Sequence, residues 1–121
     1  MAATYQETVV HKQPSGILAS STGEIVATVT NDATTSARLD FKAFTFGTVK
    51  NSSGASDTIT WYAANHLTGA AYVLKDQDGA AVSQVVGNNE IHELHSALAG
   101  CAIIIPVGSV ASAALNFIFK R

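Results

Sequence analysis

Two histidines and two glutamates fall within six positions of the segment NNEIHELHSALAG, residues 88–100, in a chain with four histidines in all. Histidine and glutamate are the ligand and base types of zinc hydrolases. The zinc-protease pattern needs histidines at i and i+4 on one helix face, whereas His92 and His95 are three apart. Glu90 could add an oxygen ligand, but no third ligand lies nearby in sequence. We expect no metal site, with His95 packed and His92 in solvent; a small metalloprotein built on both histidines is one alternative.

Other reactive residue types also lack a catalytic setting. The chain has no Gly-x-Ser-x-Gly nucleophile elbow, and Cys101 precedes the apolar run AIIIP, where a small buried thiol is expected. Asp76 and Asp78 flank a predicted hairpin turn, where aspartate is common because it stabilises turn geometry. No catalytic role is needed to explain them. No glycine-rich phosphate loop precedes a helix. We therefore expect a protein that is not an enzyme and that has no cofactor.

The amino-acid composition indicates which classes of binding partner the chain is not expected to recognise. The chain has 121 residues, of which 13% are charged, with a formal net charge of −2 and seven scattered basic residues. Nothing here predicts binding to nucleic acid or to an anionic membrane. The first ten residues lack a signal-peptide pattern, and no apolar run is long enough to span a bilayer. One cysteine permits no intrachain disulfide, which fits a reducing cytoplasm. The low charge suggests that another protein covers part of the surface.

Side-chain alternation predicts β-strands along most of the chain. Residues 24–30 and 57–64 alternate apolar and polar positions, and residues 38–50 alternate with a change of phase near Ala43. That change suggests a bulge or a strand that leaves one sheet for another. Asp78-Gly79 predicts a hairpin tip, and CAIIIPV and SAALNFIFK are expected to pair around Gly108.

Seven or eight strands with turns about every ten residues predict one all-β, antiparallel sandwich. Residues 1–22 are expected to form an N-terminal strand or arm, and residues 23–121 the β-sandwich domain. The exception to the strand pattern is the helical spacing of Ile91, Leu94, His95 and Leu98, with Gly100 as a C-cap. It predicts one short helical turn near residues 92–99.

Three aromatic residues allow a binding hypothesis. Trp61 and Tyr62, with Tyr72 across a loop, could stack on a sugar. Neighbours on a strand face opposite sides, so we expect Trp61 in the core and Tyr62 at an interface. A carbohydrate- or receptor-binding virion module that uses Tyr62, Tyr72 and His66 is the main alternative function.

The chain from Asp57 onward resembles a widespread type of tailed-bacteriophage capsid decoration (cement) protein. The matching features are Trp61-Tyr62, Asp78-Gly79, Glu93-Leu94, Ala97-Leu98-Ala99-Gly100 and the strand Cys101–Ile105. His95 departs from the pattern, in which proline follows Glu-Leu. The resemblance implies a jelly-roll-like β-sandwich on the capsid outer surface of a virion, assembled in the host cytoplasm.

The resemblance also implies partners. The chain would bind the major capsid protein, associate as a homotrimer and cement neighbouring capsomers, with no nucleic acid, membrane or small-molecule substrate involved. Residues 1–20 and the loops at the sandwich edge are expected to dock on the shell. The candidate interface residues are Tyr5, Val9, Val10, Ile17, Leu18, Tyr62 and Tyr72.

Overall fold

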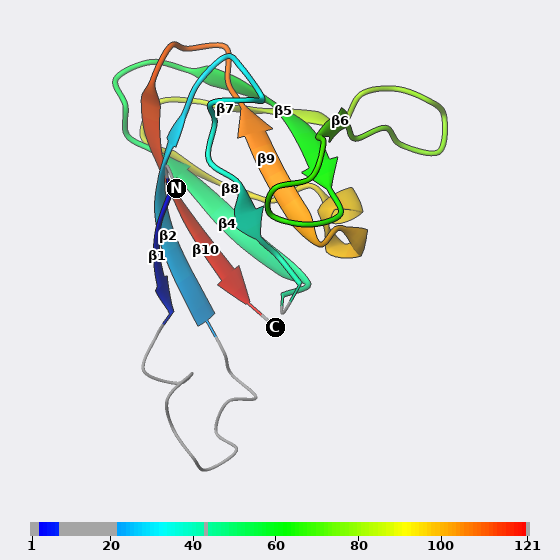
Figure 1. The fold of residues 1–121 in the computed structure, drawn as a ribbon. Coiled ribbons are helices and arrows are strands. Elements are labelled where there is room, and N and C mark those ends of the chain that lie inside the picture. The colour runs from blue at the N-terminus through cyan, green and yellow to red at the C-terminus, as the bar shows by residue number, and fades with distance from the viewer. Residues whose placement is uncertain (1–2, 8–21, 43, 121) are drawn as a thin grey trace.

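The fold is a sandwich of two antiparallel sheets (Figure 1). The computed structural model describes residues 3–7, 22–42 and 44–120. Sheet A has the strand order β1-β2-β10-β4-β8, and sheet B has the order β3-β9-β5-β6, with β7 also paired to β5. The elements are β1 (Ala3–Glu7), β2 (Thr22–Val29), β3 (Leu39–Asp40), β4 (Phe46–Asn51), β5 (Asp57–Ala64), β6 (Tyr72–Val73), β7 (Ser83–Val86), β8 (Glu90–Glu93), η3 (Ser96–Gly100), β9 (Ile103–Val107) and β10 (Ala113–Lys120).

The connectivity is that of a jelly roll. From β2 onward the chain alternates between the sheets, except that β5, β6 and β7 follow one another within sheet B. If β6 and β7 are taken as two halves of one strand, sheet A contains the first, eighth, third and sixth strands. Sheet B then contains the second, seventh, fourth and fifth. This is the double-sheet arrangement expected for a jelly roll, so the predicted all-β, jelly-roll-like sandwich is confirmed.

The core lies between the sheets and follows the predicted alternation. In β2, Ile25, Ala27 and Val29 are fully buried, and in β5 Ile59 and Trp61 are. The rings of Trp61 and Phe117 meet edge to face with centroids 6.1 Å apart. Such burial of aromatic and branched side chains is the main stabilising contribution in a sandwich of this size.

Residues 38–50 pass from one sheet to the other, which is one of the two explanations predicted for the phase change near Ala43. β3 pairs with β9 in sheet B, whereas β4 pairs with β10 and β8 in sheet A. Phe41 and Phe44 are both buried in the corner, and Phe46 at the start of β4 is 54% exposed. The change of phase therefore marks the strand switch.

The Asp78-Gly79 hairpin is present as an excursion from the edge of sheet B (Figure 1). Its base is closed by three backbone hydrogen bonds: Trp61 N–H to the Val82 carbonyl, Val82 N–H to Leu74, and Leu74 N–H to Trp61. Gly79 has a φ of +82°, which a glycine adopts without strain. β6 and β7, on either side of the hairpin, both pair with β5.

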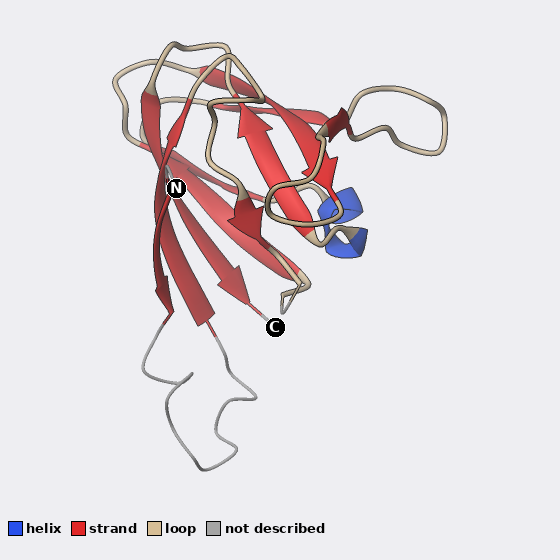
Figure 2. Ribbon diagram, in the orientation of Figure 1, coloured by secondary structure: helices blue, strands red, loops and turns tan. Residues whose placement is uncertain are grey.

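One expectation about the C-terminal part of the chain is wrong, and a second is confirmed with shifted bounds. The last two strands do not pair with each other: β9 lies between β3 and β5, and β10 lies between β2 and β4. The Gly108 turn therefore crosses from sheet to sheet. Residues 90–93 are strand, not helix, because their backbone pairs with β4; Ile91 is accordingly 66% exposed. The predicted short helical turn is present (Figure 2). It begins only at Ser96, is a 3-10 helix and has Cys101, not Gly100, as its C-cap.

Candidate functional site

The segment 88–100 closes one end of the sandwich. Asn89 turns the chain with a φ of +62°, and its N–H donates to the Asn51 carbonyl at 2.7 Å. Leu94 and Leu98 are 5% and 1% exposed in the main core. Both leucines therefore close this end of the core.

The two histidines have separate structural partners. His92 Nε2 lies 2.8 Å from Glu90 Oε1, and the Gly87 N–H donates to the same carboxylate oxygen. These two hydrogen bonds lower the pKa of Glu90, and the bond to His92 has the larger effect. His95 is the N-cap of η3, where its Nδ1 accepts the Ala97 N–H at 3.1 Å. His95 is thus half-exposed at a helix terminus, not on a helical core stripe, and within the described residues no three metal-ligating side chains come together.

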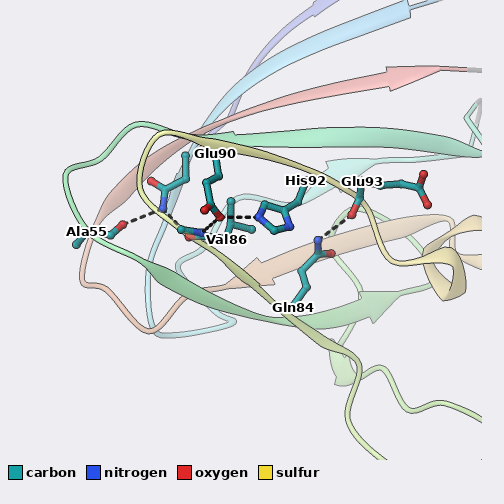
Figure 3. A network of polar contacts seen from close by, with 8 residues as sticks. Ala55, Gln84, Val86, Glu90, His92 and Glu93 are labelled. Carbon is teal, nitrogen blue, oxygen red and sulfur yellow. Dashed lines mark hydrogen bonds and ion pairs between the residues drawn. The ribbon is translucent and has the colours of Figure 1, made fainter.

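Gln84 joins the two sheets at the same end. Its Oε1 accepts hydrogen bonds from Trp61 Nε1 at 3.0 Å and from the His95 N–H at 3.1 Å. Its Nε2 donates to the Glu93 carbonyl at 2.9 Å. Figure 3 shows the Gln84 side chain extending to the backbone of Glu93, beside the Glu90–His92 contact. One amide therefore pairs the Trp61 indole N–H, the His95 N–H and the Glu93 carbonyl.

Two further buried polar residues are structural. Asn51 is fully buried and donates to the carbonyls of Ala55 and Val86 (Figure 3). Asp57 is also fully buried, and its Oδ1 accepts the Ser109 N–H at 2.7 Å and the Val110 N–H at 3.4 Å. Asp57 thus holds the sheet-to-sheet turn after β9. Sequence patterns gave no signal for either role, because Val86 and Ser109 are distant along the chain from Asn51 and Asp57.

Cys101 behaves as a small packed residue. Its side chain is half-buried against the main core, with Sγ 3.9 Å from the Ala97 carbonyl oxygen. Burial raises the pKa of the thiol, the opposite of what activates a nucleophilic cysteine.

The three aromatic residues do not form a stacking platform. Trp61 is fully buried, as predicted. Tyr62 pairs with Ile105 and packs with Ala64 and Ile103 on the outer face of sheet B. Tyr72 pairs with Ala63, the neighbour of Tyr62, and therefore faces the opposite side of the sheet. Tyr72 is 73% exposed.

The other candidate interface residues belong to the N-terminal segment. Tyr5 lies in β1, the edge strand of sheet A, opposite Ile25. Val9, Val10, Ile17 and Leu18 lie outside the described residues. The expectation that they contact a capsid therefore stays a prediction.

The outer faces of the two sheets differ. Sheet B is covered in part by its own loop: residues 65–71 are fastened by Arg38, whose Nη1 donates to the Gly69 carbonyl at 2.7 Å. Beneath them Ala64, Ile103 and Ile105 form a second buried cluster, with Ala71 packed against it. As a result β9 is buried on both faces.

Sheet A has no described element over its outer face. Val26, Phe46, Ile91 and Ile118 are 48%, 54%, 66% and 37% exposed there. The registers align Val26, Asn116, Lys50 and Ile91 in one row across four strands, and Ile118, Thr48 and Glu93 in the next. Lys50, Glu93 and Lys120 form no ion pair with a described residue. We call these four apolar and three charged residues the sheet A patch.

Comparison with known proteins adds one structural likeness. No family model and no curated relative matches the chain. One solved structure, that of the SPBc2 prophage-derived protein YomS, aligns over 100% of this chain and 96% of its own at 17% identity, with a TM-score of 0.47. Among the described residues, no helix is long and apolar enough to cross a membrane.

Proposed function

We propose that the protein is a structural virion protein that binds the outside of a phage capsid through the sheet A patch and cements neighbouring capsomers. The observation that carries this proposal is the uncovered outer face of sheet A. Exposed apolar side chains gathered on one face, together with charges of both signs, are typical of a protein–protein interface. The sequence resemblance to capsid decoration proteins supplies the partner, the major capsid protein.

The mixed charge of the patch favours a protein partner. Lys50 and Lys120 lie on the same face as Glu93, so the patch has no single strong sign of charge. A nucleic-acid or anionic-membrane surface would select for basic residues alone. Phe46 and Ile118, beside these charges, would supply apolar area that is removed from water on docking.

The resemblance supports three further parts of the proposal. The chain associates as a homotrimer, its location is the capsid outer surface after assembly in the host cytoplasm, and it acts without catalysis, cofactor or small-molecule substrate. A trimer would combine weak contacts of each subunit into tight binding. Residues 1–20, including Tyr5, would add contacts beside sheet A, of which β1 is the edge.

The test is reconstitution on capsids of the encoding phage prepared without this protein. Wild-type protein should co-sediment with the capsids and raise the temperature at which they release DNA. Phe46→Ser/Ile118→Ser should bind at least about tenfold more weakly, because it removes apolar area from the patch. Val85→Ser is the matched control, since Val85 is 57% exposed on the outer face of sheet B.

The outcomes separate cleanly. If wild-type protein does not bind and capsid stability is unchanged, the cement function is wrong. If wild-type and Phe46→Ser/Ile118→Ser bind equally while Val85→Ser does not, the docking face is sheet B. Sedimentation equilibrium of the free protein should give three times the 12.5 kDa chain mass; a monomer at all concentrations would refute the trimer.

A further inference from the structure

His95 caps the short helix η3 with its side chain. Its Nδ1 accepts the Ala97 backbone N–H at 3.1 Å, and its carbonyl accepts the Leu98 N–H at 3.0 Å. A backbone N–H can only donate, so the ring nitrogen that faces Ala97 carries no proton. The contact therefore requires a neutral ring with its proton on Nε2.

The cap holds a turn that closes one end of the sandwich. Leu98, in the middle of η3, is 1% exposed in the main core, and its carbonyl accepts the Cys101 N–H at 3.0 Å. η3 has five residues, too few to be stable without contacts at its ends. The position of Leu98 in the core thus depends in part on the His95 side chain.

The backbone of His95 is anchored independently of its ring. The His95 N–H donates to Gln84 Oε1 at 3.1 Å, so residue 95 stays attached to β7 whatever the state of the imidazole. A change in the ring therefore acts on η3 alone.

A proton on the ring removes the cap. Histidine changes charge between about pH 5 and 8, and the charged ring is a donor at both nitrogens. Nδ1 of His95 would then present an N–H to the Ala97 N–H, and a positive charge is unfavourable beside the first N–H groups of a helix. The contact consequently stabilises η3 only while the ring is neutral, and this stabilisation is lost as the pH falls.

The ionisable groups around the ring leave this response to the ring itself. The ring forms no ion pair with any residue in 3–7, 22–42 or 44–120, and η3 and β7 contain no ionisable residue. Lys50 on β4 and Glu93 on β8 lie on the outer face of sheet A. His92 is bound to Glu90, and Cys101 packs against the core.

We propose that His95 is a pH-sensitive latch, which holds η3 closed while its ring is neutral and releases it when the ring takes up a proton. The released turn is confined to residues 96–101, because no pairing between strands involves the His95 ring. The latch goes beyond capsid binding and does not depend on it, since neither His95 nor Ala97 belongs to the sheet A patch.

Amide hydrogen exchange followed by NMR tests the latch in the intact chain. The protection factors of the Ala97 and Leu98 amides, which are corrected for the intrinsic effect of pH on exchange, should fall at least about fivefold from pH 8 to pH 5. That factor corresponds to the loss of one N-cap contact. Constant protection of both amides over this range overturns the proposal.

Two variants assign the effect to one ring. His95→Asn keeps a side-chain oxygen that caps a helix at any pH, so its Ala97 and Leu98 protection should not change between pH 8 and pH 5. His92→Asn is the matched control, because it removes the neighbouring histidine and leaves the cap; it should respond as wild type. The proposal is wrong if His95→Asn still loses protection, or if His92→Asn no longer does.

The wild-type ring gives a check that needs no variant. Nitrogen-15 NMR of His95 at pH 8 should show an unprotonated Nδ1 and a protonated Nε2, as the bond from Ala97 requires. A proton on Nδ1 at this pH would rule out the cap and the latch with it.

Discussion

The Gln84 amide oxygen accepts the indole N–H of Trp61 at 3.0 Å, although the two residues lie 23 positions apart. The same amide binds the backbone of Glu93 and His95. A residue in sheet B thereby ties the buried tryptophan to the edge of sheet A.

Gln84→Ala should lower the free energy of unfolding by about 1–3 kcal/mol. It leaves the part-buried Trp61 N–H without its partner, and an unsatisfied buried group costs about 1–3 kcal/mol, whereas the exposed Glu93 carbonyl can turn to water. Urea denaturation followed by Trp61 fluorescence measures the change. Ser83→Ala, at the exposed neighbouring position, is the control. Equal stability of the two variants would show that the amide bridge contributes nothing.

Asp57→Ala should destabilise the protein by about 2–4 kcal/mol, because it removes the buried acceptor of the Ser109 and Val110 N–H groups in a partly buried turn. Asp57→Asn keeps an amide oxygen at the same place and should cost less. Thermal unfolding compares the two variants with wild type. The assignment fails if Asn is as harmful as Ala, since the oxygen would then not be the group that matters.

The two phenylalanines Phe117 and Phe46 should respond differently to the same substitution. Phe117 is fully buried, so Phe117→Ala should cost about 3–5 kcal/mol through lost burial and a cavity. Phe46 is 54% exposed on the sheet A patch, so Phe46→Ala should cost less than about 1 kcal/mol. Chemical denaturation of both variants is the check. A large loss at Phe46 would mean that it supports the fold and is not merely presented to a partner.

The Glu90–His92 contact predicts a pH effect on one carboxyl group. In the folded chain, the hydrogen bonds from His92 and from the Gly87 N–H lower the pKa of Glu90. Its stabilising contribution is therefore present above the unfolded pKa and is lost as the pH falls through the lowered folded value. In His92→Ala the Glu90 pKa should rise toward the ordinary glutamate value but stay below it, because the Gly87 bond remains. A carboxyl NMR titration measures this; an unchanged pKa would show that His92 does not contribute.

Features that follow from local side-chain alternation, such as which strand residues face the core, could be predicted from the sequence. Contacts between residues far apart along the chain could not. Alternation in residues 24–30 and 57–64 places Ile25 and Trp61 in the core correctly, because successive strand residues face opposite sides. The change of phase near Ala43 even indicated the switch between sheets. The helical spacing from Ile91 to Leu98 was misleading, since Leu94 and Leu98 reach the core from a strand end and a 3-10 turn.

Less of the candidate site could be predicted, because its contacts also join residues that are far apart along the chain. Asp57 and Ser109 are 52 positions apart, and no local sequence pattern near either residue predicts the contact. That contact holds a turn which, judged by length alone, resembled a hairpin.

The closed base of the 74–82 hairpin has a consequence for engineering. Because the backbone bonds among Trp61, Leu74 and Val82 complete the sheet before the excursion begins, the residues at the Asp78-Gly79 tip contribute no pairing to β5. The tip should therefore accept a peptide insertion without a change in the sandwich, much as exposed loop tips generally do. Attached to a particle at many copies, such a tip would display a foreign epitope away from both sheets.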